Sequence, residues 1–132
     1  MQYSLTIIVI VLVFSYVIYR AVNYYRKTSR YFINVNDDVI RSFCIDNNCH
    51  FPFDEFKSLW VTVSKNLGCP DGKMIENCKI RLLMENYPFP EIFVDDIFMD
   101  FEKYSQFSWN KEMLFGEFIA SLYESKNNNN VP

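Results

Sequence analysis

The chain has 132 residues, of which 50% are hydrophobic and 18% aromatic, so one domain with a packed core is expected and general disorder is excluded. Only 3 residues are glycine, which disfavours turn-rich β-architectures. The net charge of −3 is unevenly distributed, because from Tyr31 onward Asp and Glu outnumber Lys and Arg by 16 to 9. Such an acidic domain is repelled by phosphate backbones, which disfavours nucleic-acid binding.

The first thirty residues contain an uncharged apolar run, "YSLTIIVIVLVFSYVIY", from Tyr3 to Tyr19. As a helix this run is about 25 Å long, and extension through Val22 brings it near the hydrocarbon thickness of about 30 Å. Tyrosines gather towards its end, where amphipathic rings favour the membrane interface: Tyr16, Tyr19, Tyr24 and Tyr25. We therefore predict one transmembrane helix within residues 1–30.

A cleaved signal peptide is the main alternative for this segment. It would begin with basic residues, have a shorter apolar stretch and end at a small-residue cleavage site. The chain instead begins "MQYS", and bulky or charged residues follow the apolar run. A buried core helix is the second alternative, but a run that is apolar on all faces suits lipid better. A retained transmembrane helix is the preferred interpretation.

A basic strip follows the apolar run and consists of Arg20, Arg26, Lys27 and Arg30. Basic residues that flank a membrane helix favour the cytoplasmic side. We therefore expect a single-pass protein of the cell inner (plasma) membrane, in contact with membrane lipid, with its C-terminal domain in the cytoplasm.

Residues 31–125 form the predicted acidic helical domain, and 126–132 a disordered tail. Four segments carry helical patterns, and a shorter helix is expected at 80–84. Asn36 and Asn110 are expected N-caps, and Gly68 is expected to stop the second pattern. The four segments are 36–48, 52–68, 92–104 and 110–125.

The segment 66–80, "NLGCPDGKMIENCKI", contains two cysteines and a turn signal, "CPDG". Pro and Asp at these positions are typical of a turn. We interpret the segment as a long first loop between helices. The expected fold is therefore all-α: a transmembrane helix followed by a small four-helix bundle.

The stretch "LWVTVSKNLGCPDGKMIENCKI", Leu59 to Ile80, resembles acyl carrier proteins, with Leu67–Gly68 and Lys73 matching that family's helix end and turn. "IFMDFEKYSQFSW" and "LFGEFIASLYE" are similar to its later helices. The resemblance implies a carrier-like bundle, as in small bacterial domains of unknown function. The phosphopantetheine-bearing serine is missing, because Glu91 or a neighbour stands in its place and no Ser or Thr occurs between Ser64 and Ser105. The resemblance therefore implies the fold and not the carrier activity.

Four cysteines and the single histidine, His50, are the candidates for metal or thiol chemistry. Structural zinc sites usually have two close cysteine pairs, and the spacings of Cys44 to Cys49 and Cys69 to Cys78 fit this poorly. Disulfides are disfavoured in the cytoplasm and become relevant if the orientation is reversed. Adjacent residues such as Cys49 and His50 seldom have nucleophile–base geometry. We expect these cysteines to act as small apolar residues that pack in the core, and we predict no metal site and no cofactor.

An acidic helix face is the candidate interaction site. Its residues are Glu91, Phe93, Asp95, Asp96, Asp100 and Glu102. A solvated surface or a divalent-cation site is an alternative for these carboxylates. By analogy with carrier-like bundles, we expect this face to bind a protein partner with a basic surface.

The leading functional hypothesis is a non-enzymatic, membrane-tethered protein-interaction module, and no small-molecule substrate is identified. One alternative is an inner-membrane immunity or protective protein that binds a toxin. The other is a small metal-binding or enzymatic domain that uses the Cys/His set.

Overall fold

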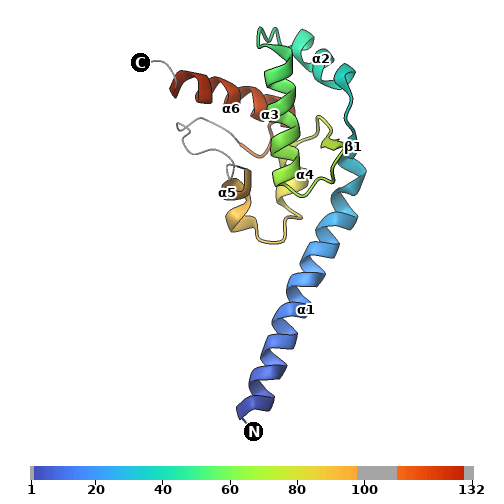
Figure 1. Ribbon diagram of the computed structural model, residues 1–132, viewed down its shortest axis with the longest axis vertical. Helices are drawn as coiled ribbons and strands as arrows, with labels where there is room; N and C mark the ends of the chain where they lie inside the picture. Colours follow the sequence, from blue (N-terminus) through green and yellow to red (C-terminus); the bar gives the residue numbers. More distant parts are fainter. Residues whose placement is uncertain (1, 98–109, 130–132) are drawn as a thin grey trace.

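The computed structural model describes residues 2–97 and 110–129, and this part of the chain is mainly helical (Figure 1). The N-terminal part of the first helix, α1 (Gln2–Thr28), projects away from the other elements and carries the N-terminus at its far end. Its most apolar 18-residue window is 0% buried. By length and composition α1 can cross a membrane, as the sequence predicts.

The other elements form a compact unit at the end of α1. In chain order they are the 3-10 turn η1 (Ser29–Tyr31), β1 (Phe32–Asn34), α2 (Asp37–Asp46), α3 (Phe53–Asn66), β2 (Lys73–Ile75), α4 (Ile80–Met84), the 3-10 turn η2 (Pro90–Ile92), α5 (Phe93–Ile97) and α6 (Phe115–Asn129).

A two-stranded antiparallel sheet corrects the all-α expectation. β1 pairs with β2 so that Phe32 lies opposite Ile75 and Asn34 opposite Lys73. Part of the segment interpreted as a long loop is therefore a strand. Three-residue strands are too short for a visible alternating pattern, and their pairing depends on contacts between distant segments. The mainly helical character of the chain is confirmed, and the four-helix, carrier-like bundle stays a prediction.

Local signals do place the ends of two helices. The side chain of Asn36 accepts a hydrogen bond from the backbone N–H of Asp38 at 2.9 Å, which makes it the predicted N-cap of α2. Gly68 follows α3 with a φ of +92°, a conformation that glycine adopts without strain. The expected short helix Ile80–Met84 is α4.

The last helix begins later than predicted, at Phe115, because the preceding residues pair with the start of α4. Leu114 forms an isolated β-bridge with Lys79, and the N–H of Phe115 donates to the carbonyl of Cys78 at 2.7 Å. Asn110 instead caps a turn, accepting from the N–H of Glu112. α6 continues to Asn129, into the segment 126–132 that was expected to lack structure.

The core is built around Trp60 of α3. Its indole lies edge-on to Phe43, Phe56 and Phe115, with ring centroids 5.9, 5.9 and 5.5 Å away. Each such aromatic pair adds about 0.5–1.5 kcal/mol beyond the burial of its area. α2, α3 and α6 are therefore joined at one aromatic cluster.

The last turns of α1 pack against this domain. Tyr24 is 6% exposed, its hydroxyl donates to the carbonyl of Leu67 at 2.7 Å, and its ring lies 5.1 Å from that of Tyr87. Thr28, one turn further on, is fully buried. Arg20, one turn earlier, donates from Nε to the carbonyl of Pro88 and from Nη2 to that of Tyr87, both at 3.2 Å. The domain is thus held directly against the carboxyl end of α1.

Two side chains of α3 bind the backbone of β2. The N–H of Ile75 donates to Ser64 Oγ at 3.0 Å, and Trp60 Nε1 donates to the carbonyl of Ile75 at 2.8 Å. Side chains of α3 therefore satisfy both the N–H and the carbonyl of the buried Ile75. These two groups lie on the side of β2 that faces away from β1.

Replacing Ser64 by Ala should destabilise the domain by about 1–3 kcal/mol, because the buried N–H of Ile75 loses its acceptor. Denaturant unfolding of the full chain in detergent micelles, followed by tryptophan fluorescence, measures this loss. Ser58→Ala on the exposed face of the same helix is the matched control and should change stability by less than about 0.5 kcal/mol. Equal effects of the two substitutions would contradict the role of Ser64.

Candidate functional site

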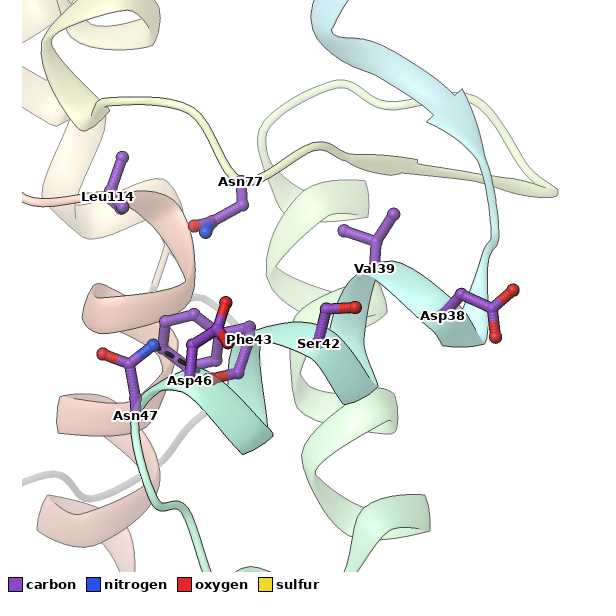
Figure 2. A pocket seen from close by; sticks show the side chains of 8 residues that line it. All are labelled: Asp38, Val39, Ser42, Phe43, Asp46, Asn47, Asn77 and Leu114. Atoms are coloured by element: carbon purple, nitrogen blue, oxygen red, sulfur yellow. Dashed lines mark hydrogen bonds between the residues drawn. The ribbon is translucent and has the colours of Figure 1, made fainter.

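A groove of about 560 Å³ runs between α2, the segment that follows β2 and the start of α6 (Figure 2). α2 supplies most of its lining, and Asn77 and Leu114 form the opposite wall. The lining residues are Asp38, Val39, Ser42, Phe43, Asp46, Asn47, Asn77 and Leu114. Since a ligand-sized groove with an apolar floor and a few polar groups is the usual form of a binding site, it is the leading candidate.

Three polar residues of the groove form a stripe along α2. Asp38, Ser42 and Asp46 are spaced four residues apart, which places them on one face of the helix, and all three are exposed. Both charged lining residues are acidic, and no lysine or arginine lines the groove among the described residues. The neighbouring Asp37 pairs instead with Lys57 of α3 at 2.8 Å. The groove therefore presents two carboxylates about 12 Å apart along α2, which fits two separate cationic groups of a partner.

Close packing sets the shape of the groove where α6 meets α2. A Cβ added at Gly116 would lie 2.6 Å from Cδ2 of Phe43 and 3.0 Å from the side-chain oxygen of Asn77. The N–H of Gly116 donates to that same oxygen at 2.9 Å. Only a glycine lets α6 approach α2 this closely without displacing the buried ring of Phe43.

The predicted acidic face on α5 is only partly assembled as expected. Phe93 is 0% exposed and packs against Tyr87 at 5.1 Å, which is a correction, because a core ring cannot contribute to a contact surface. Asp96 accepts a hydrogen bond from the hydroxyl of Tyr87. Glu91 is exposed. α5 includes Asp95, whose side chain is not described, and Asp100 and Glu102 lie outside the described residues.

Tyr87 has a raised pKa, mainly because of burial and then because its hydroxyl faces Asp96. The tyrosine therefore stays protonated, and its hydroxyl donates a hydrogen bond to the carboxylate of Asp96. This hydrogen bond connects Asp96 of α5 to Tyr87, in the segment that follows α4.

The cysteines lie in two different settings. Cys69 and Cys78 are buried in the core, whereas Cys44 and Cys49 are half-buried and their thiols share a hydrogen bond. Burial raises the pKa of Cys49 to about 11, that of Cys69 to about 11 and that of Cys78 to about 12. At neutral pH these thiols stay protonated, which makes them poor nucleophiles.

Neither a metal site nor a thiol–imidazole pair is assembled in the part of the chain that the structure describes. All four cysteines are free, and no group of three or more His, Cys, Asp or Glu side chains there could hold a metal ion. His50 is exposed beside Cys49. Apolar filling remains the simplest role for the buried pair, Cys69 and Cys78.

The membrane-flanking residues separate into two kinds. Arg26, Lys27 and Arg30 are exposed, as expected for a basic strip. Arg20 is half-buried and bonded to the domain, so it has a structural role in addition to the predicted one beside a membrane. The sequence gives no sign of this, because the two carbonyls that it binds lie more than sixty positions later.

The groove itself is not among the predicted sites, although the four-residue spacing of Asp38, Ser42 and Asp46 is visible in the sequence. A stripe of this kind usually marks an exposed face, and only the placement of Asn77 and Leu114 across from it makes a groove. Comparison with known protein families, with curated proteins and with solved structures gives no match. The resemblance to acyl carrier proteins therefore stays a prediction.

Replacing Gly116 by Ala should destabilise the domain by about 1–3 kcal/mol, because the added methyl group overpacks the contact with Phe43. Unfolding in detergent micelles measures the loss. In a Phe43→Leu background the same substitution should be less destabilising, since the smaller side chain leaves room. A neutral or stabilising Gly116→Ala in the parent chain would show that this contact does not constrain the groove.

Proposed function

We propose that the chain is a non-enzymatic, single-pass membrane protein whose acidic helical domain binds a protein partner with a basic surface. The observation that carries the proposal is the groove along α2, whose two charged lining residues, Asp38 and Asp46, are both acidic. Complementary charge steers encounter and selects among partners more than it adds raw affinity.

Membrane anchoring is the first part of the proposal and rests on α1. Its apolar stretch is uncovered by the domain, with side chains such as Leu12 and Phe14 more than 60% exposed. A continuous apolar surface of this kind is unfavourable in water and favourable in lipid. The anchor places the domain at the surface of a membrane, which we assign to the cell inner (plasma) membrane.

The cytoplasmic position of the domain is the second part and rests on the basic strip. Arg26, Lys27 and Arg30 are exposed at the carboxyl end of α1. Their charges are therefore free to interact with the anionic cytoplasmic leaflet. In that reducing compartment the four cysteines remain thiols.

The binding role is the third part and rests on the shape and charge of the groove. Val39, Phe43 and Leu114 provide apolar surface beside the stripe of Asp38, Ser42 and Asp46. A partner segment with basic residues at helical spacing, or an extended basic segment, matches this arrangement of charge beside an apolar surface. The predicted acidic face, which includes Asp96 of α5, would extend this acidic surface.

A C-terminal topology reporter on the full chain should be found on the cytoplasmic side of the membrane. Exchange of Arg26, Lys27 and Arg30 for Gln, together with Gln2→Lys and Ser4→Lys, should move a large fraction of the reporter to the other side. Arg20 is left intact because it holds the domain. A parent chain with its reporter outside would contradict the proposed orientation.

Neutralising the groove with Asp38→Asn and Asp46→Asn should weaken capture of a basic protein partner by about two- to thirtyfold, since each exposed ion pair contributes about 0.2–1 kcal/mol. Quantitative cross-linking in intact membranes measures the captured fraction, which should also fall with added salt. Asp54→Asn with Asp71→Asn is the matched control. It removes the same charge from exposed positions outside the groove, one of them in the first turn of α3. Equal losses from the two double variants would rule out the groove as the binding site.

A further inference from the structure

We propose that residues 87–92, here named the interfacial loop, form a second contact with the membrane, at the boundary between headgroups and acyl chains. The inference rests on the proposed membrane anchoring by α1 and adds a surface that fixes how the domain sits on the lipid. The occupant of this surface is the lipid of the same membrane that α1 spans.

The first step places the membrane boundary along α1. No charged side chain occurs from Tyr3 to Tyr19, and Arg20 is the first charge of the helix. The distance from Gln2 to Arg20 along a helix is about 27 Å, close to the hydrocarbon thickness of about 30 Å. Arg20 therefore lies at the edge of the hydrocarbon, where long basic side chains reach the headgroup region.

The second step places the interfacial loop at the same level. Arg20 donates to the carbonyls of Tyr87 and Pro88, both at 3.2 Å. One turn above, Tyr24 packs against the ring of Tyr87. In Figure 1 the segment between α4 and α5 lies at the end of the domain that faces the N-terminal part of α1, and α2 lies at the opposite end. The loop is thus held beside the point where α1 leaves the hydrocarbon.

The third step is the chemistry of the loop, "YPFPEI". Ile92 is 39% exposed and Phe89 is half-buried, so apolar surface is available to lipid. Pro88 and Pro90 have no backbone N–H, which lowers the number of donors that need water. The N–H of Ile92 donates to the carbonyl of Phe89 at 3.0 Å, so this donor is satisfied within the loop.

The fourth step is charge. Glu91 is the one acidic residue of the loop, and the guanidinium of Arg20 lies against the same loop. Asp96, which accepts a hydrogen bond from Tyr87, adds a second carboxylate beside the loop, so anionic headgroups are not expected to be what attracts it. Apolar burial in a zwitterionic interface is the expected driving force.

The experiment measures quenching of tryptophan fluorescence by acyl-chain-brominated phosphatidylcholine, with the full chain reconstituted in vesicles. Ile92→Trp reports the interfacial loop. Ile45→Trp is the matched control, because Ile45 is an exposed isoleucine, 75% accessible, on α2 at the opposite end of the domain. Phe14→Trp reports the anchor. The signal of the parent chain, which contains Trp60 and Trp109, is subtracted in each case.

Quenching of Ile92→Trp at least about threefold above that of Ile45→Trp, with strong quenching of Phe14→Trp, is the expected result. Quenching of Phe14→Trp alone would overturn the interfacial loop and leave the anchor in place. Equal quenching of the two isoleucine positions would show non-specific adsorption and would also overturn it. No quenching of Phe14→Trp would overturn the anchor and the loop together.

A second set of variants tests the connection to α1. Arg20→Gln, added to Ile92→Trp, should reduce the quenching of the loop while leaving that of Phe14→Trp unchanged, because the loop loses the two bonds that hold it beside the helix. Phe89→Trp provides an independent reporter if Ile92→Trp disturbs the turn. Undiminished loop quenching in the Arg20→Gln variant would contradict the role of Arg20.

Discussion

The arrangement of the molecule depends on the contact between the last turns of α1 and the domain. Arg20, Tyr24 and Thr28 recur every four residues and form one stripe, and the domain covers this stripe. Without it, the domain could rotate freely relative to α1. With it, the direction of α1 fixes the orientation of the domain, and under the proposed anchoring it determines which surface of the domain faces lipid.

This contact separates the two surfaces to which we assign roles. The interfacial loop lies on the side of the apolar part of α1, and the acidic groove along α2 lies towards the far end. In the proposed arrangement, a partner in solution approaches the groove without meeting the membrane. The aromatic cluster around Trp60 joins α2 to α3 and α6, whereas the loop residue Tyr87 packs against Tyr24 and Phe93.

Local signals were sufficient for α1, α2, α3 and α4, where apolar periodicity, the cap at Asn36 and the stop at Gly68 agree with the structure. They failed where distant segments decide the outcome. Lys73–Ile75 is a strand because β1 and the side chains of Trp60 and Ser64 bind it. The start of α6 is displaced because Leu114 pairs with Lys79. The same reason explains Phe93, whose burial follows from packing against Tyr87 and not from its position on a helical stripe.

The position of Tyr24 has a practical consequence for obtaining the domain without the apolar part of α1. A fragment that begins at Tyr31 would lack a ring that belongs to the hydrophobic core, and the carbonyl of Leu67 would lose its hydrogen-bond donor. The cut would open a cavity against Tyr87 and leave apolar surface exposed. A water-soluble version must therefore retain the chain from Arg20 onward, so the natural border of the folded unit lies inside the helix and not at its end.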